Sequence, residues 1–516
     1  MRLYIKEKRY AIVAFIMCCI ILLVYATVKN INTYYWDSEY YFGIADSVLS
    51  SGSFRITDFP DTYRGYLLPV LILLFKSMFR GVWGWRILIS VILSAGMSFV
   101  FPYILDDKGI DTFAKLMRLI PVMVAVIFFW GDFLQYPLSD IPSIIFLGAG
   151  TALLISLIRK NELSILSAVI RSLCAGIMMY AAYNTRAAFL YGILPVLVIF
   201  VFFMRKIPVK TIICLLCMLI GISAVALPQC LINRKYLGRF TPSINTNKYT
   251  EEFYDYSQDL MTQQVYWGLL YDRFEGYIGD LNEFPDNAVY YDDHVGASII
   301  EQEGLDETIF KLSDFFRLYV KYPVDMTGIY IRHLVSLMTP VYNEQYITDM
   351  YGSKALTVGV SMIIWLLTGI SICNTIARKN LTCSALWVIA LMIPSLLQLL
   401  GAPEIRFFIP LYLMAYTYVF VMVDYRSLYS DIKERIWGVV IVTGIVALLW
   451  LAIIGDIMSN CNSRTILVGG CRTEHTSLIC ENNVVKYGNS DFEIVLSRRG
   501  RCFEGFEVGK LQTERG

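Results

Sequence analysis

AAFLYGILPVLVIFVFFM, at residues 187–204, is a stretch of eighteen residues without a charged side chain. The hydrocarbon core of a bilayer is about 30 Å thick, so a helix needs roughly 20 mostly apolar residues to cross it. Two of the other apolar runs, 119–131 and 172–183, are shorter, which leaves their boundaries open. We therefore predict an all-α polytopic membrane protein with eleven crossings, the other ten being centred on 11–28, 83–105, 119–131, 141–158, 172–183, 211–230, 355–376, 382–400, 405–423 and 436–456.

The composition supports this fold class. Of 516 residues, 56% are hydrophobic and 17% are charged, whereas about a quarter of an ordinary soluble chain is charged. This shortfall, with the repeated apolar runs, excludes a soluble enzyme, a disordered chain and a fibrous protein. The 44 Lys and Arg residues nearly balance the 43 Asp and Glu residues, for a formal charge of +1, which gives no indication of a nucleic-acid partner.

Two apolar segments need separate interpretation. The first run, 11–28, follows a basic N-terminal stretch and lacks a convincing small-residue cleavage site, so we interpret it as an uncleaved anchor. The segment 66–79, YLLPVLILLFKSMF, is about 14 residues long and contains Pro69 and Lys76. It is more typical of a helix lying in the membrane interface than of a crossing.

The distribution of Lys and Arg predicts the orientation. If the N-terminus is cytoplasmic, the six short cytoplasmic segments hold 17 Lys and Arg in 49 residues. The short outer turns at 132–140, 183–188 and 400–406 hold only Arg186 and Arg406. We therefore predict a multi-pass protein of the plasma membrane with a cytoplasmic N-terminus and an extracytoplasmic C-terminus. Three larger segments are then outside: 29–82, 231–354 and 457–516.

These segments suggest two domains, a transmembrane domain at 1–456 and a small extracytoplasmic tail at 457–516. Within the first, the outer loop 231–354 has a net charge of −9 and enough apolar spacing for a small mixed subdomain. The tail contains short strand-like runs at 465–468 and 493–497, which predict a β-rich fold. Its four cysteines favour two disulfides in one of three connectivities, rather than a zinc site, because no CxxC pair occurs; they are Cys461, Cys471, Cys480 and Cys502.

Asp37 follows the first crossing, in the stretch Tyr35-Trp36-Asp37-Ser38-Glu39-Tyr40-Tyr41. If a helix starts there, Tyr41 shares the face of Asp37, while Glu39 points elsewhere. Two interpretations are open. Asp37 either caps the helix, a frequent role of aspartate, or carries chemistry at the outer membrane surface.

Other ionisable groups lie at helix ends on the same predicted side. Asp140 precedes Ile141-Pro142, Arg186 ends the fifth crossing, and Glu404 and Arg406 precede the tenth. Such groups are costly inside lipid and normally face a polar cavity. A local Glu404–Arg406 pair and an N-cap role for Asp140 are the alternatives that stay open.

The order of these motifs resembles that of the membrane glycosyltransferases with the GT-C fold, which include protein O-mannosyltransferases and the aminoarabinose transferase of lipid A. The resemblance covers most of residues 1–425. It rests on an outer D-x-x-x-Y-x-x-x-A motif at Asp37, an S-D-x-P motif at Asp140, a glycine-led crossing from Gly176 to Arg186, and an E-x-R-F-x-x-P motif at Glu404. This chain departs from the pattern at Ser38, where many members carry an acid, and whether Glu39 replaces that acid is open.

The resemblance implies inverting transfer of a sugar from a polyprenyl-phosphate donor to a cell-surface glycan, lipid or protein at the extracytoplasmic face. Asp37 would be the base. Arg186 and Arg406, with Arg64 as a third candidate, would bind the donor phosphate. Glu39, Tyr41, Asp140 and Glu404 would support the site or bind the acceptor. No cofactor is required; some relatives use a divalent ion, but we predict no metal site.

Two other classes are weighed against this interpretation. A polysaccharide polymerase or O-antigen-ligase-type transferase is also polytopic, but it should place its key Arg and His in the late outer loop. A transporter or flippase for lipid-linked sugars should show charged residues at the bilayer midplane and repeated halves, and neither is found in the sequence.

Overall fold

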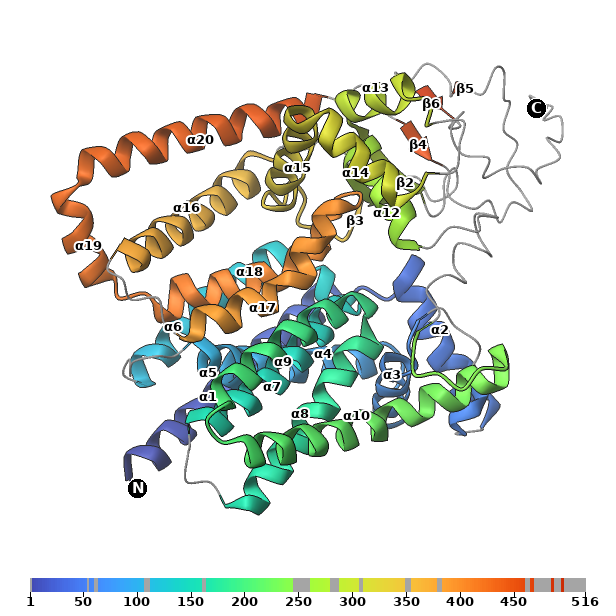
Figure 1. Cartoon of the computed structure of the whole chain (residues 1–516), viewed down its shortest axis with the longest axis vertical. Helices are drawn as coiled ribbons and strands as arrows, with labels where there is room; N and C mark the ends of the chain where they lie inside the picture. The colour runs from blue at the N-terminus through green and yellow to red at the C-terminus, as the bar shows by residue number, and fades with distance from the viewer. Residues whose placement is uncertain are drawn as a thin grey trace. The chain divides into compact units, whose positions relative to one another are not determined.

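The computed structural model describes residues 2–52, 55–59, 64–105, 112–159, 164–244, 260–278, 287–305, 310–348, 354–377 and 383–459, with three short strands between 465 and 495. The chain divides into two compact units. Unit 1 comprises 1–245, 363–396 and 409–439, and unit 2 comprises 246–362, 397–408 and 440–516. Figure 1 labels the elements of both units.

The regular elements of unit 1 are all helices within its described residues. Its helices are α1 (Arg2–Lys29), α2 (Trp36–Ser51), η1 (Ile56–Asp58), α3 (Leu67–Met78), α4 (Trp83–Ala95), η2 (Gly96–Val100), α5 (Phe101–Leu105), α6 (Thr112–Trp130), η3 (Phe133–Gln135), α7 (Asp140–Arg159), α8 (Ile165–Thr185), η4 (Ala187–Phe189), α9 (Leu190–Met204), α10 (Pro208–Leu237), α17 (Cys383–Leu397), α18 (Ile409–Tyr416), η7 (Thr417–Met422) and α19 (Tyr425–Glu434). Two longer helices, α16 (Ala355–Ala377) and α20 (Ile436–Ser459), have residues in both units.

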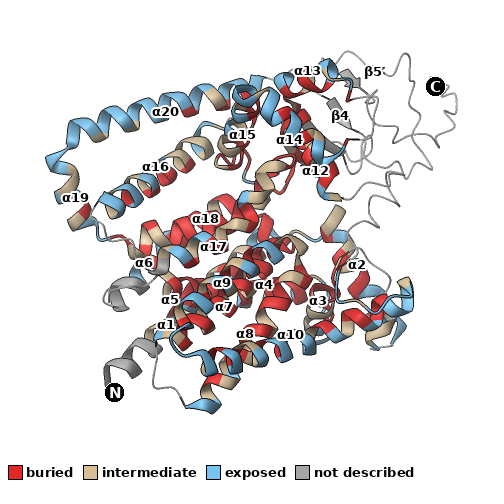
Figure 2. Ribbon diagram, in the orientation of Figure 1, coloured by how far each residue is buried: buried red, intermediate tan, exposed pale blue. Residues whose placement is uncertain are grey.

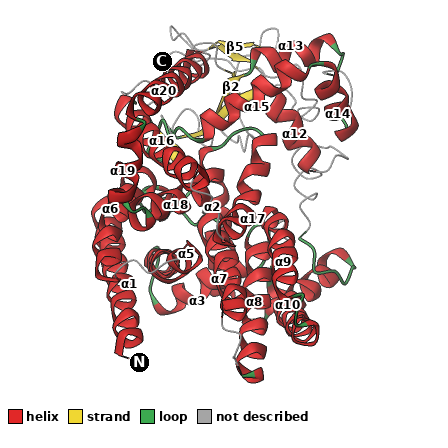
Figure 3. Cartoon of the chain, turned by 60° about the vertical axis from the view of Figure 1, so that its left-hand side comes forward, coloured by secondary structure: helices red, strands yellow, loops and turns green. Residues whose placement is uncertain are grey.

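Unit 2 combines helices with a small mixed sheet (Figure 3). Strand β1 pairs antiparallel with β2 and parallel with β3, and the short β4 adds to β2. Strands β5 and β6 form a separate antiparallel pair. The elements are α12 (Leu260–Leu270), β1 (Tyr271–Tyr277), β2 (Asn287–Asp292), α13 (His294–Gln302), α14 (Leu312–Lys321), α15 (Pro323–Leu337), β3 (Tyr346–Ile347), η5 (Gln398–Leu400), η6 (Ile405–Phe408), β4 (Thr465–Leu467), β5 (Val484–Lys486) and β6 (Glu493–Val495).

The chain is a many-span helical membrane protein. Among the described residues, nine helices are long and apolar enough to cross a membrane, and each coincides with one of the eleven predicted runs. The other two runs, 119–131 and 382–400, correspond to shorter apolar helices at Met117–Trp130 and Ala385–Leu400. The predicted helix at 66–79 is present as α3, and its depth in the membrane stays a prediction.

The structure sets a boundary that the sequence left open. The run predicted at 172–183 is the helix α8, which has 21 residues and begins at Ile165. The apolar run begins late because of Arg171, whose Nη1 donates a hydrogen bond to Ser156 Oγ at 2.5 Å. Because Ser156 of the neighbouring α7 provides a partner for Arg171, this charged residue lies inside α8 although the apolar run begins only after it.

Burial separates the crossings into two kinds (Figure 2). In α7, 72% of an 18-residue apolar stretch is buried, whereas in α20 the corresponding fraction is 11%. Most of α20 therefore presents apolar side chains outward, as a lipid-facing helix does, while α7 is an inner helix of unit 1. Asp140, the first residue of α7, begins this inner helix.

Helices α8 and α10 approach each other at glycines. A Cβ atom on Gly176 would lie 2.1 Å from the carbonyl oxygen of Met218, and one on Gly221 would lie 2.2 Å from that of Leu173. Small residues allow such close backbone contact between membrane helices. This packing fixes the end of α8, which is followed directly by Arg186.

Candidate functional site

Asp37 lies in the first turn of α2 without capping it. The side chain of Ser38 closes the start of the helix, where its Oγ accepts a hydrogen bond from the Tyr35 amide at 3.2 Å. Trp36 has a φ of 52°, a left-handed conformation that bulky residues rarely adopt and that often accompanies functional sites. The capping interpretation of Asp37 is therefore wrong, and its carboxylate is directed to another partner.

That partner is Arg64. Its Nη2 lies 2.6 Å from Asp37 Oδ1, and the two side chains keep 28% and 18% of their surface exposed. The loop that carries Arg64 is fixed to the end of α8, because a Cβ on Gly65 would lie 1.8 Å from the carbonyl oxygen of Asn184. The amide of Leu67 also donates to Asn184 Oδ1 at 2.9 Å. The pair is thus held in place but remains accessible.

A second aspartate–arginine pair joins α7 to the end of α8. Arg186 Nη1 lies 2.8 Å from Asp140 Oδ1, and the side chains are 12% and 3% exposed. The other oxygen, Asp140 Oδ2, is buried and has no hydrogen-bond partner among the residues that the structure describes. The sequence left open an N-cap role for Asp140, and the structure adds this long-range ion pair.

Tyr41 lies within electrostatic reach of both pairs. The residue is 1% exposed, and burial raises its pKa, while the charges of Arg64, Asp37 and Arg186 all act on its hydroxyl group. The hydroxyl lies beside Ser139 but makes no hydrogen bond of ordinary geometry within the described part of the chain. We call the five residues Asp37, Tyr41, Arg64, Asp140 and Arg186 the aspartate–arginine cluster.

The remaining predicted residues lie elsewhere. Glu39 is exposed on α2, away from the buried Tyr41 face, as predicted. Glu404 and Arg406 belong to unit 2, where Arg406 Nε lies 2.5 Å from Glu404 Oε1. The local pair that the sequence left open is therefore present. The four tail cysteines, Cys461, Cys471, Cys480 and Cys502, lie outside the described residues.

A buried amide chain supports the cluster, and its residues have no role among the sequence predictions. Asn184 Nδ2 donates to Gln229 Oε1 at 2.9 Å, and Gln229 Nε2 donates to Asn233 Oδ1 at 3.0 Å. Asn233 Nδ2 then donates to the carbonyl oxygen of Thr241 at 2.7 Å. In the sequence, Gln229 and Asn233 lie in the stretch that the resemblance covers, and the amides occur where apolar runs end. Their effect is to join α8, α10 and the loop bearing Arg64.

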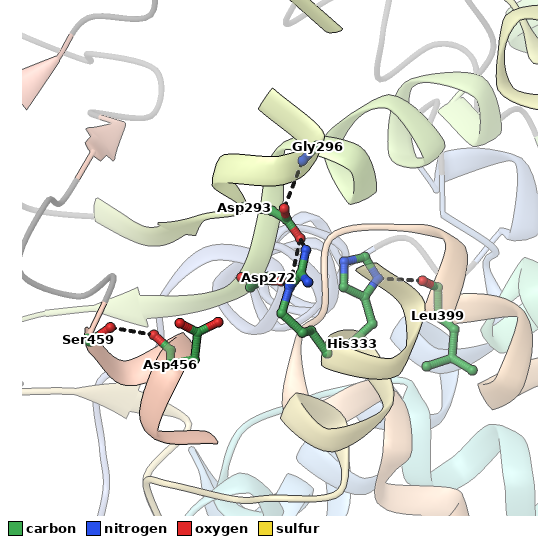
Figure 4. A network of polar contacts seen from close by, with 8 residues as sticks. Asp272, Asp293, Gly296, His333, Leu399, Asp456 and Ser459 are labelled. Carbon is green, nitrogen blue, oxygen red and sulfur yellow. Dashed lines mark hydrogen bonds and ion pairs between the residues drawn. The ribbon is translucent and has the colours of Figure 1, made fainter. Parts of the chain in front are cut away.

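Unit 2 contains a separate polar network (Figure 4). Arg332 Nε lies 3.0 Å from Asp272 Oδ1 and 3.1 Å from Asp293 Oδ2, and Asp293 Oδ1 caps α13 by accepting from the Gly296 amide at 2.8 Å. His333 Nδ1 contacts the Leu399 carbonyl oxygen at 2.7 Å. The side chains of Asp272, Asp293 and His333 are all at most 1% exposed, which is typical of a structural network.

Burial sets the charges of this network. It raises the pKa of Asp272 to about 9, with a further increase from the neighbouring Asp293. Burial also acts to raise the pKa of Asp293, but hydrogen bonds from Asp272 and Arg332 lower it overall. The pKa of His333 falls to about 4, mainly because of burial. At neutral pH the network therefore holds a protonated Asp272, an ionised Asp293 and a neutral His333.

The search for metal-binding groups among the described residues and the comparisons with known proteins assign no function to the chain. Among the described residues, no group of three or more His, Cys, Asp or Glu side chains could hold a metal ion. No protein-family model matches the chain, and no curated protein matches it.

Proposed function

We propose that this protein is a membrane glycosyltransferase of the GT-C type, which transfers a sugar from a polyprenyl-phosphate donor to an acceptor hydroxyl group with inversion. The observation that carries the proposal is the aspartate–arginine cluster of unit 1. Two carboxylates and two guanidinium groups form two ion pairs, and the charges of Asp37, Arg64 and Arg186 act on Tyr41, although the four groups come from four separate segments of the chain. Carboxylates act as general bases, and guanidinium groups bind phosphate.

Asp37 is the proposed base. Its carboxylate is 18% exposed, so an acceptor hydroxyl group can reach hydrogen-bond distance, which a general base requires. The hydroxyl oxygen attacks the anomeric carbon and its proton passes to Asp37. The bond between that carbon and the phosphate oxygen breaks, and polyprenyl phosphate leaves with the electron pair. Attack from the side opposite the leaving group inverts the anomeric centre.

The arginines are the proposed phosphate ligands. A guanidinium group binds phosphate oxygens through two parallel charge-assisted hydrogen bonds, and it stabilises the charge that develops on the leaving group. Arg64 and Arg186 each already bind one carboxylate oxygen. A bound phosphate would compete with Asp37 for Arg64 and so release the base when the donor is in place. Arg406 and Glu404 belong to unit 2, and their roles in donor binding stay predictions from the sequence.

The membrane orientation is part of the proposal. The excess of Lys and Arg in the predicted cytoplasmic segments supports a cytoplasmic N-terminus. The cluster then belongs to the extracytoplasmic side of the plasma membrane, with a cell-surface glycan, lipid or protein as acceptor. The tail at 457–516 is proposed to lie on that side, where its cysteines can form disulfides.

The polymerase or ligase alternative is less well supported. It would need an arginine and a histidine of the outer loop to meet the substrate, and Arg332 and His333 are adjacent there. His333 is fully buried, and Arg332 is engaged by two carboxylates. Both residues are explained by the packing of unit 2.

The substitution Asp37→Asn tests the mechanism. Asparagine keeps the shape of the side chain and cannot accept the proton, so we expect the variant to insert into membranes normally and to lose sugar transfer. The measurement is the mass of glycan on cell-surface material from cells that lack the protein or express the wild type or the variant. Binding of polyprenyl phosphate by the purified protein should be retained.

Glu434→Gln is the control, because Glu434 is an exposed carboxylate at the end of α19 and has no role in the proposed site. It should leave the glycan mass unchanged. If Asp37→Asn adds sugar at the wild-type level, Asp37 is not the base and the proposed mechanism is wrong.

A further inference from the structure

Helix α14 carries an exposed apolar stripe. Leu312, Phe316 and Val320 recur every four residues and therefore lie along one face of the helix, and Val324 extends the row into α15. Their exposed fractions are 38%, 60%, 83% and 80% in chain order. Another face of α14 packs inward through Phe315 and Leu318, so the helix is apolar on two sides.

The stripe is not explained by a membrane crossing. Helix α14 has ten residues, or about 15 Å at the usual rise, which is half the thickness of the hydrocarbon core. A single exposed apolar side chain is ordinary, whereas a contiguous row of them marks a contact surface. Figure 3 shows α14 at the edge of the helices of unit 2, where such a surface can meet an extended partner.

The flanks of the stripe identify the partner. Lys311, Arg317 and Lys321 accompany it, and Tyr319 is 38% exposed beside it. Apolar residues bordered by Lys, Arg and aromatic side chains are the composition of helices that lie in the headgroup layer. Arg317 and Lys321 already balance Asp314 and Glu303, and their aliphatic stems can extend along an apolar surface while the charges reach lipid phosphates.

The attachment of α15 keeps this surface near the bilayer. The C-terminal end of α15 is bonded to two candidate crossings: Trp450 Nε1 of α20 donates to Thr339 Oγ1 at 2.7 Å, and Ser361 Oγ of α16 donates to the Met338 carbonyl oxygen at 3.0 Å. Helix α15 has fifteen residues, so the near end of α14 is tethered within about 22 Å of these two contacts. In Figure 1 the helices α12–α15 gather at the C-terminal end of α20.

We propose that the stripe of α14 rests in the lipid headgroup layer and anchors unit 2 on the membrane surface beside its crossings. The occupant is the bilayer itself, and the anchor does not depend on the catalytic activity proposed for unit 1. The stripe resembles α20 in leaving apolar side chains uncovered, since only 11% of the 18-residue apolar stretch of α20 is buried.

Photocrosslinking in the full-length protein tests this proposal. p-Benzoylphenylalanine replaces Val320 in one preparation and Gln302, an exposed residue of α13 in the same unit, in another. Both proteins are reconstituted in nanodiscs of phosphatidylethanolamine and phosphatidylglycerol, irradiated, and analysed by peptide mass spectrometry. We expect phospholipid adducts at position 320 at a yield several-fold above that at position 302.

A second variant tests the stripe as a unit. Phe316→Asp in the preparation labelled at position 320 should reduce the lipid adduct several-fold, because a carboxylate resists burial at the boundary of the acyl chains and is repelled by anionic phosphatidylglycerol. Ser298→Asp on α13 should leave the yield unchanged. Equal yields at positions 320 and 302 would overturn the proposal. So would crosslinks in native membranes that join position 320 mainly to another protein chain.

Discussion

At the residue scale, the main finding is that Asp37 and Asp140 are each paired with an arginine and that Tyr41 lies among them. The two pairs differ in access to solvent. The Asp37–Arg64 pair is partly exposed, whereas Asp140 keeps 3% of its side-chain surface. Asp37 is thus suited to meet a substrate. Asp140 is suited to hold Arg186 in place, and losing either member of that pair should affect folding as well as binding.

Removing Arg186 therefore has two effects that can be separated. Arg186→Ala leaves Asp140 buried without its counter-ion, which should cost about 3–5 kcal/mol of stability. The measurement is thermal unfolding of the purified protein, together with its affinity for polyprenyl phosphate. The double variant Asp140→Asn, Arg186→Ala removes the unpaired charge and should recover most of the melting temperature.

Donor affinity is the deciding readout in the double variant. If Arg186 binds the donor phosphate, affinity should stay low although stability returns. Recovery of both properties would mean that Arg186 acts only as the partner of Asp140.

At the element scale, the site depends on how α8 and α10 pack. Gly176 and Gly221 let the two backbones approach closely, and the amide chain from Asn184 through Gln229 to Asn233 joins the C-terminal parts of the two helices. Helix α10 has 30 residues, about 45 Å at the usual rise, which exceeds the hydrocarbon core by about 15 Å. Its extension past the apolar run 211–230 is what brings Asn233 to this network.

Gly176→Ala should disturb this packing. The added Cβ would lie 2.1 Å from the Met218 carbonyl oxygen, and because that atom is backbone, the two helices must separate. We expect a lower melting temperature and, since Arg186 follows α8 directly, weaker binding of polyprenyl phosphate.

Gly43→Ala is the matched control, because its Cβ would meet no atom within 4 Å. Alanine favours a helix by up to about 1 kcal/mol over glycine, so this variant of α2 should be as stable as the wild type or more stable. A Gly176→Ala protein that melts at the wild-type temperature would show that the close contact is not needed.

At the scale of the whole molecule, the chain combines a helical unit that carries the aspartate–arginine cluster with a second unit built on a small mixed sheet. The second unit has its own core and its own polar centre around Arg332. Because that centre contains a protonated aspartate and a neutral histidine, the stability of this unit should depend on pH.

The direction of this dependence follows from the two pKa values. Asp272, at about 9, keeps a proton that the unfolded chain releases above its ordinary pKa of about 4. Its contribution to stability is therefore lost as the pH rises towards 9. His333, at about 4, contributes stability that is lost as the pH falls below its ordinary value of about 6.5. The two trends oppose each other between pH 4 and 6.5.

Above about pH 6.5 the effect of Asp272 should dominate, with a loss of at most about 1.4 kcal/mol per pH unit up to pH 9. Asp272→Asn mimics the protonated acid and should flatten the melting temperature across this range. Asp293→Asn, which weakens the α13 cap and an ion pair with Arg332, should destabilise the protein at every pH. An unchanged slope in Asp272→Asn would exclude Asp272 as the titrating group.

The sequence by itself determined the class of the protein and most of its crossings. Apolar runs such as 187–204 must avoid water whatever their neighbours are, so composition and length identify them. Local spacing also separated the exposed Glu39 from the buried Tyr41, and the strand-like runs at 465–468 and 493–497 contain β4 and β6. These features are local, and residues a few positions apart decide them.

Only the tertiary structure decided which charges meet. Nothing in the sequence separates Arg64 from Arg406 as a partner of Asp37, because ion pairs between distant segments depend on how helices pack. The start of α8 stayed open for the same reason, since Arg171 is accommodated by Ser156 of another helix. Local chemistry could nominate Asp37, Asp140 and the arginines, but long-range packing assigned each arginine to its carboxylate and placed Tyr41 among them.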